Sequence, residues 1–241
     1  MQQCCVHSPG QYKIQKLHES METEPPTGST KPSSGALGGR IWGSNKITWK
    51  IITDTPTIPG KEIEVQIFKR VFTQLGLYIP QKIVQLNKPT ADADIRIYFS
   101  KDDPYWVQFP SALAYGWGPG AGQGGDITFN SKNYIWAPDG KSVRADKAYE
   151  LGWITSFVKP DNKLKTWNAQ HTGTHEGQHS LGCRHIPKET CPGAVINPIY
   201  NGGLLIKQCE IDQLQGFYGK PNLTKTQIDQ AIKEYLTPIP Y

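Results

Sequence analysis

Residues 175–185 read HEGQHSLGCRH, and this stretch limits what the chain can fold into more than any other. His175 and His179 are four residues apart, so on a helix both imidazoles lie on one face and can reach a single metal ion. Gly182 then permits a backbone turn that residues with a side chain resist. The turn brings His185 back toward the first two histidines. Three imidazoles and one open position are typical of a catalytic zinc ion, whereas structural zinc usually has four protein ligands.

Glu176 follows the first of these histidines, where its carboxylate can take a proton from a metal-activated water. Two histidines four residues apart arise by chance in many helices, but the added glycine and third histidine at fixed spacing rarely do. The chain has only 6 histidines, and three of them fill these positions. We therefore expect a site with Glu176 as the catalytic general base and, as zinc ligands, His175, His179 and His185.

The composition indicates a globular protein without a membrane span. Hydrophobic residues make up 37% of the 241 residues, and the net charge of +5 is scattered, with no dense basic block. This pattern gives no reason to expect a nucleic-acid partner. No stretch approaches the roughly 18 apolar residues that a membrane-spanning helix needs. The first 20 residues contain no continuous apolar core of the kind found in secretory signals. We expect the protein to be a monomer.

The chain changes character at about residue 40. Residues 1–39 include a segment rich in Pro, Gly, Ser and Thr, and we expect them to form a flexible leader and linker. Residues 40–241 are expected to form one catalytic domain with a short C-terminal helix. The 5 cysteines are an odd number, so at least one lacks an intrachain partner. One disulfide is compatible with the spacing near the site, but the sequence does not choose the pair among Cys183, Cys191 and Cys209.

Hydrophobic periodicity predicts alternating strands and helices, which indicates an α/β (α+β) fold with a mixed sheet backed by helices. An edge strand is expected near residue 111, at the start of a glycine-rich stretch. The other predicted strands are residues 46–53, 82–86, 94–99 and 126–130. The predicted helices are residues 62–75, 166–181, 208–218 and 224–236, with a further helix near 142–157.

Residues 42–219 resemble the catalytic domain of the matrixins, the matrix metalloproteinase type of metzincin zinc peptidase. The zinc motif is one of several ordered matches. Residues 194–200 (AVINPIY) resemble the family's Met-turn and the wall of its primed-side specificity pocket, and residues 210–219 resemble its last helix. Upstream, residues 93–97 (ADIRI) and 113–116 (LAYG) match two strands. The resemblance implies a zinc endopeptidase with a twisted five-stranded sheet, one antiparallel edge strand and an active-site helix. It also suggests an extracellular location.

The resemblance also implies how a substrate binds. An extended peptide is expected to pair with the backbone of the edge strand and so to add a strand to the sheet. The residues expected to bind it are Ala112, Leu113 and Ala114 on the edge, with Pro198 and Tyr200 on the opposite wall. The Met-turn methionine is Ile196 here, which supplies a similar volume of hydrocarbon, so we expect the exchange to be tolerated.

Two further metal sites of the family have different prospects. The positions of a structural zinc are Pro104, Trp106, Tyr115 and Thr128, which are unsuited to zinc, so we expect no second zinc ion. The oxygen ligands of a calcium site have counterparts in the carboxylates of Asp94 and Asp126 and the carbonyls of Gly122 and Gly124. The alternative is that Asp126 only begins a strand and that the glycines form a solvated turn.

Other functions remain open at this point. The same site chemistry suits a zinc amidase or peptidase that acts on a structural polymer such as a cell-wall peptide. A catalytically silent binding module on the same fold is a third reading, although such a module has no need of Glu176. Cys4 and Cys5 raise the question of a cysteine that blocks the zinc site, but their surroundings do not match the family's switch sequence.

Overall fold

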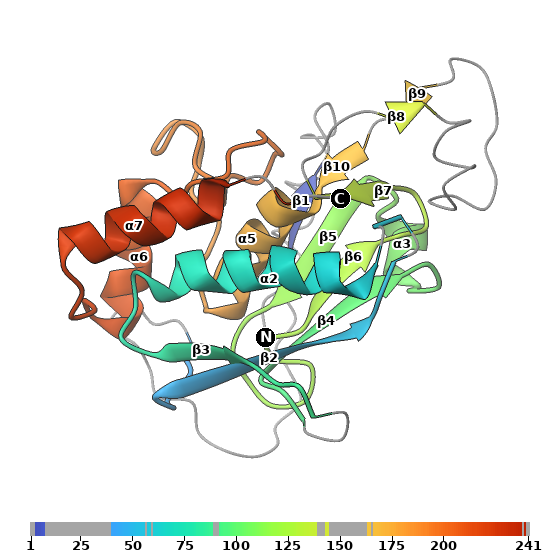
Figure 1. Ribbon diagram of the computed structural model, residues 1–241. Coiled ribbons are helices and arrows are strands. Elements are labelled where there is room, and N and C mark those ends of the chain that lie inside the picture. Colours follow the sequence, from blue (N-terminus) through green and yellow to red (C-terminus); the bar gives the residue numbers. More distant parts are fainter. Residues whose placement is uncertain are drawn as a thin grey trace.

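The computed structural model describes most of the chain beyond residue 40 and one short segment before it. The described residues are 3–7, 40–55, 57–58, 60–88, 92–138, 143–144, 163–164, 166–237 and 239. They form a mixed sheet with helices packed against it (Figure 1). The predicted α/β fold class is therefore confirmed.

Five strands make up the sheet of the matrixin-like region. Their order is β5 (Ala112–Trp117), β6 (Ile127–Asn130), β4 (Ile95–Ser100), β2 (Lys46–Thr53) and β3 (Lys82–Gln85). Neighbouring strands are parallel except for β5 and β6, which are antiparallel. Alternating burial places Ile47 and Ile51 of β2 and Ile95 and Ile97 of β4 in the core. The sheet thus has the predicted order of parallel strands and one antiparallel pair.

The first segment of the chain adds a sixth strand, β1 (Gln3–His7), beside β5. The two strands are antiparallel, with Gln3 opposite Trp117 and His7 opposite Ala112. Figure 1 shows β1 in blue alongside the green β5. We had expected all of residues 1–39 to be a flexible leader, and this expectation fails for β1. An edge strand with free N–H and C=O groups accepts another strand readily.

Helix α2 (Lys61–Gly76) covers the sheet with an apolar face that repeats at helical spacing. Its aromatic residues carry the core: Phe72 lies 5.2 Å from Trp49 of β2, and Phe68 lies 5.6 Å from Phe129 of β6, measured between ring centroids. All four side chains are almost completely buried. This core fixes α2 on the sheet, and α2 in turn supports the next helix.

Helix α5 (Ala169–Ser180) packs directly against α2 (Figure 1). Gly173 and Gly177 lie at this contact, although glycine weakens a helix interior. A Cβ atom on Gly177 would lie 2.8 Å from Cδ1 of Leu75, and one on Gly173 would lie 3.2 Å from Phe68 and from Val71. Any side chain at these positions would push the two helices apart, so close packing explains the glycines.

The start of α5 differs from the prediction. We expected a helix from residue 166, but Thr166–Asn168 form strand β10, which pairs in parallel with β7 (Ile135–Ala137). The side chain of Asn168 accepts a hydrogen bond of 2.9 Å from the backbone N–H of His171 and so caps the helix. Pairing with β7 and a good cap therefore delay the helix by three residues.

The remaining elements are short or lie toward the C-terminus. The helix expected near residues 142–157 falls mostly outside the described residues, and Val143–Arg144 form strand β8 with β9 (Lys163–Leu164) instead. The other helices are α3 (Tyr105–Gln108), α6 (Gln208–Tyr218) and α7 (Lys225–Leu236). Among the helices that the structure describes, none combines the length and apolar character needed to cross a bilayer.

One disulfide joins the segment after the zinc motif to a helix. Cys191 pairs with Cys209 of α6, and their Cα atoms are 6.5 Å apart. Cys183 is buried and is the free cysteine among the described side chains. The structure thus chooses between the pairings that the sequence left open.

Candidate metal centre and substrate edge

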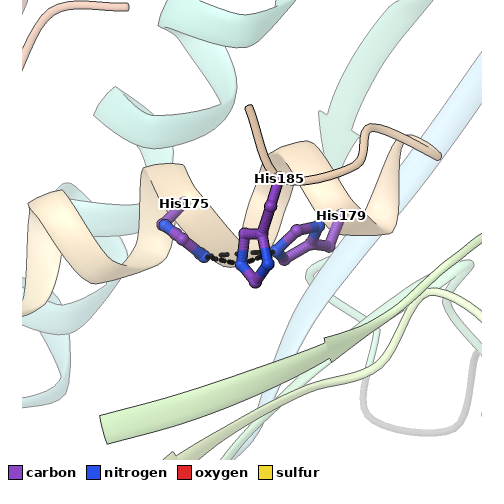
Figure 2. Close-up of side chains that lie close together, drawn as sticks. All are labelled: His175, His179 and His185. Carbon is purple, nitrogen blue, oxygen red and sulfur yellow. Dashed lines mark hydrogen bonds between the residues drawn. The ribbon is translucent and has the colours of Figure 1, made fainter. Parts of the chain in front are cut away.

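Three imidazoles converge at the C-terminal part of α5. His175 and His179 project from the helix, and His185 reaches them from the segment that follows (Figure 2). The Nε2 atom of His175 lies 3.1 Å from that of His179 and 3.1 Å from that of His185, and the third side of the triangle is 3.2 Å. A tetrahedral zinc ion with Zn–N bonds of about 2.0–2.1 Å requires nitrogens about 3.3 Å apart. The triangle therefore fits zinc.

Hydrogen bonds from the far side of each helical imidazole set its tautomer. Nδ1 of His175 lies 2.8 Å from the carbonyl of Val195, and Nδ1 of His179 lies 2.8 Å from the carbonyl of Cys183. A carbonyl can only accept, so each Nδ1 carries the proton and each Nε2 presents a lone pair. Lone pairs that face one another at 3.1 Å repel unless a cation lies between them.

Burial keeps these rings neutral, which is the form that binds metal. It lowers the pKa of His179 to about 4. The pKa of His175 falls well below its ordinary value, mainly through burial and also through the neighbouring His179 and His185. Among the described residues, this is the only place where three His, Cys, Asp or Glu side chains converge.

The turn after α5 depends on Gly182, as predicted. Its φ is 93°, which a residue with a side chain rarely adopts, and a Cβ atom there would lie 2.4 Å from the carbonyl oxygen of Arg40. The N–H of Gly182 donates to the carbonyl of His179 at 2.8 Å, and the N–H of Cys183 donates to the carbonyl of Gln178 at 2.9 Å. These bonds end the helix and direct the chain back toward the metal centre.

Glu176 is a residue of α5 on the side of the helix that faces β5. It is completely buried. A Cβ atom on Gly116 of β5 would lie 2.9 Å from the backbone oxygen of Glu176 and 3.0 Å from its Oε2. The carboxylate therefore borders β5. Gly116 keeps that space open, a role that sequence reasoning missed because it depends on the approach of two distant elements.

Glu210 of α6 is a second residue that the sequence did not single out. Its buried carboxylate accepts hydrogen bonds from the backbone N–H groups of Val195 at 3.1 Å, Ile196 at 2.9 Å and Lys207 at 2.7 Å, and from Nε2 of Gln178 at 2.9 Å. The carbonyl of Val195 in turn holds His175. Glu210 therefore holds the peptide unit between Val195 and Ile196, and the carbonyl of that unit orients His175. Outer partners of metal ligands act in this way.

The predicted substrate edge is the outer backbone of β5. Ala112, Leu113 and Ala114 are buried on this strand. In the structure, β1 pairs with two of these residues, with Val6 opposite Ala114 and His7 opposite Ala112, and the register shifts between the two pairs, at Leu113. The edge is therefore able to accept an antiparallel extended segment.

The predicted opposite wall lies beside the zinc helix. Pro198 and Tyr200 are partly buried. The Tyr200 ring packs edge-on against Trp167, at 4.8 Å between centroids, and against His171 of α5, at 4.3 Å. Ile196, which stands where the family has methionine, is completely buried in the main core.

His171 shares the helix with the zinc ligands but lies outside their cluster. Its ring is completely buried, and Nδ1 contacts the carbonyl of Gly203. Burial lowers its pKa to about 4.

Three of the four groups expected to bind calcium have hydrogen-bond partners within the protein. Asp126 and the carbonyl of Gly122 are both bound by the guanidinium of Arg96. Asp94 instead accepts hydrogen bonds from the backbone N–H and the hydroxyl of Thr48, at 2.7 and 2.6 Å. As the alternative reading has it, Asp126 lies directly before a strand, β6. That reading did not include the contact between Asp126 and Arg96.

Two of the four positions that correspond to a structural zinc, Trp106 and Tyr115, belong to an aromatic cluster. Trp106 and Tyr115 pack with their rings 5.4 Å apart. The hydroxyl of Tyr115 donates to Asp103 at 2.5 Å, and Nε1 of Trp106 donates to the carbonyl of Ser100 at 2.9 Å. Zinc in proteins is bound by Cys, His, Asp and Glu side chains, and neither Trp106 nor Tyr115 is of this kind.

Comparisons with known proteins agree with this geometry. The sequence model of the matrixin family matches residues 41–219. Matrilysin of Rattus norvegicus is 29% identical over 190 residues, which are 75% of this chain and 60% of matrilysin. Interstitial collagenase of Bos taurus is 26% identical over 198 residues, which are 79% of this chain and 35% of the collagenase. The chain thus spans 60% of the one relative and 35% of the other. The family model matches most of the chain, and the matched region includes five of the six strands of the main sheet, the three converging histidines and α6, so the chain belongs to the matrixin family.

Proposed function

We propose that this protein is a zinc-dependent endopeptidase in which Glu176 is the general base. One observation carries the proposal: three Nε2 atoms lie within 3.2 Å of one another, next to a buried glutamate, in a domain of the matrixin family. A binding module has no use for a buried carboxylate beside such a centre.

The residues of the site divide the work of hydrolysis. Zinc, when bound, supplies Lewis acidity, which activates water and polarises the scissile carbonyl. His175, His179 and His185 hold the ion as neutral ligands. Glu176 accepts the proton of the attacking water and later delivers it to the leaving amine. The carbonyls of Val195 and Cys183 keep two of the rings in the tautomer that this requires.

We propose that the substrate is a peptide in extended conformation that pairs antiparallel with β5 at Ala112, Leu113 and Ala114. The pairing of β1 with the same strand supports this binding mode. Pro198 and Tyr200 line the opposite wall. Recognition through backbone hydrogen bonds favours unfolded or extended segments over folded ones.

The proposal extends to the surroundings in which the protein works. The Cys191–Cys209 disulfide supports an extracellular or otherwise oxidising compartment. All predicted ligands and the base come from one chain, which supports a monomer. The modest net charge of +5 gives no support for a nucleic-acid partner.

Casein digestion by the zinc-loaded chain tests the activity, with Glu176→Gln as the critical variant. We expect the wild type to cleave casein and the variant to lose roughly 10³-fold in rate while it retains one zinc ion per chain. Glu189→Gln, an exposed glutamate in the segment after the motif, is the matched control and should keep full activity.

Other outcomes point elsewhere. If the wild type binds zinc but cleaves no protein or peptide, the proposal is wrong and the chain is a binding module. If it releases products only from cell-wall peptide polymers, the amidase reading replaces the endopeptidase. Undiminished cleavage by Glu176→Gln would remove Glu176 from the mechanism.

A further inference from the structure

Arg96 of β4 lies among the groups that the family resemblance assigns to calcium. Its Nε donates to Oδ1 of Asp126 at 2.8 Å, and its Nη2 donates to Oδ2 of the same carboxylate at 2.9 Å. Nη2 also donates to the carbonyl of Gly122 at 2.5 Å. One guanidinium therefore binds two of the four expected calcium ligands, and it binds the carboxylate through both oxygens, the strongest form of such a pair.

The third expected ligand is also engaged. Oδ2 of Asp94 accepts two hydrogen bonds from Thr48 of β2, and the backbone N–H of Asp94 donates back to the Thr48 hydroxyl at 3.1 Å. This arrangement directs the carboxylate toward β2. Calcium needs six to eight oxygen ligands at about 2.3–2.6 Å. Here the guanidinium already engages both oxygens of Asp126 and balances its charge.

The Arg96–Asp126 pair sits where the loop of residues 118–126 returns to the sheet. Asp126 is nearly buried, with 8% of its side chain exposed, whereas Arg96 is 24% exposed. Burial raises the pKa of Asp126, and the hydrogen bonds from Arg96 oppose that rise. The loop joins β5 to β6, and the N–H of Trp117 donates to the carbonyl of Asp126 at 2.9 Å. A cation at this point therefore fastens the strand pair that carries the substrate edge.

We propose that Arg96 is a built-in cation that takes the place of calcium in this domain, so that the folded, zinc-loaded chain neither binds calcium here nor needs it. The charge of the guanidinium neutralises Asp126, and its planar fork fixes the carboxylate and the loop carbonyl together. The inference concerns binding and stability, so it stands apart from the proposed peptidase activity.

Thermal unfolding of the full chain, purified in calcium-free buffer with zinc, provides the test. We expect the melting temperature of the wild type to stay the same when millimolar calcium chloride is added, and equilibrium dialysis to find no calcium on the protein. Arg96→Met should lower the melting temperature by roughly 5–10 °C, because it leaves a buried carboxylate without its partner. Arg96→Lys, which keeps the charge but loses the fork, should fall between the two. Lys101→Met, an exposed change next to the same strand, is the matched control and should have little effect.

The wild-type titration decides the matter even if Arg96→Met does not fold. A rise of several degrees in the wild type on adding calcium, or stoichiometric calcium in the dialysis, would overturn the proposal. So would an Arg96→Met protein as stable as the Lys101→Met control. Because none of these measurements uses a substrate, an inactive protein would leave the result interpretable.

Discussion

Among single residues, Gly116 has the sharpest consequence for activity. It lies on β5 opposite Glu176, and a Cβ atom there would come within 3.0 Å of the Glu176 carboxylate. We predict that Gly116→Ala displaces the base and lowers kcat by roughly tenfold or more, because small misplacements of catalytic groups are costly. Zinc content should remain at one ion per chain, which atomic absorption checks.

Two comparisons make this prediction specific. Gly118→Ala serves as the control, since a Cβ atom there would meet only the backbone oxygen of His179, at 3.8 Å. Its kcat should match the wild type. Unchanged kcat in Gly116→Ala would show that β5 and the zinc helix adjust without moving Glu176, and the assigned role of Gly116 would be wrong.

The residues that the sequence placed at the site are those whose relation is local. The spacing of His175, His179 and Gly182 predicts convergence because helix period and glycine turns act over a few residues. Gly116 and Glu210 could not be found in this way, since their contacts with the site join separate elements. The contact between Arg96 and Asp126 could not be predicted for the same reason, because nothing in the sequence pattern shows that these two side chains lie together.

Among the elements, β1 affects function most directly, because it covers the edge on which we expect the substrate to bind. A segment tethered to the same chain competes at an effective concentration in the millimolar range. We predict that deletion of residues 1–39 lowers KM for an extended peptide by roughly tenfold or more and leaves kcat unchanged. Steady-state kinetics on a fluorogenic peptide measure both constants.

A proline in β1 tests the pairing without removing residues. Val6 lies opposite Ala114, and proline in its place disrupts the ladder. Val6→Pro should lower KM as the deletion does, whereas Val6→Ala should not. A double Cys4→Ser and Cys5→Ser chain should keep the wild-type KM if strand pairing is responsible. If it behaves like the deletion instead, the thiols block the site; if no variant changes KM, β1 does not compete with substrate.

The prediction of elements from the sequence succeeded where a repeating apolar pattern meets a single buried face. The pattern of α2 and the alternation of β2 are of this kind. The start of α5 was misplaced because residues 166–168 pair with β7. Each residue of this pair of strands is 31 positions from its partner in the sequence, so a local pattern does not reveal the contact. β1 was missed because a polar leader gives no apolar pattern, and its pairing depends on the open edge of β5.

The stability of the folded chain should depend on pH through a buried carboxyl group on α2. Glu64 of α2 is 1% exposed, and its Oε1 accepts a 2.7 Å hydrogen bond from the backbone N–H of Thr55, while Oε2 has no hydrogen-bond partner. Burial raises its pKa from 4.5 to about 7; the hydrogen bond from Thr55 opposes this rise, nearby Asp54 adds to it, and Lys61 opposes it. The folded state therefore holds a proton that the unfolded state releases between these pH values.

Because the pKa of this carboxyl is higher in the folded state, its ionisation destabilises the fold as pH rises from 4.5 to about 7, and the loss is complete above that range. Glu64→Gln removes the charge but keeps the shape and the acceptor for Thr55. We predict that the variant matches the wild type at pH 5 and exceeds it at pH 8 by about 2–3 kcal/mol in the free energy of unfolding. Urea unfolding of the zinc-loaded wild type and variant across this range measures the difference in free energy. The effect of pH on the histidine ligands is the same in both chains, so it cancels in this difference.

Glu62→Gln, an exposed change on the same helix, should show no such trend. A constant difference between Glu64→Gln and the wild type at all pH values would mean that Glu64 is ionised throughout and that another group carries the dependence.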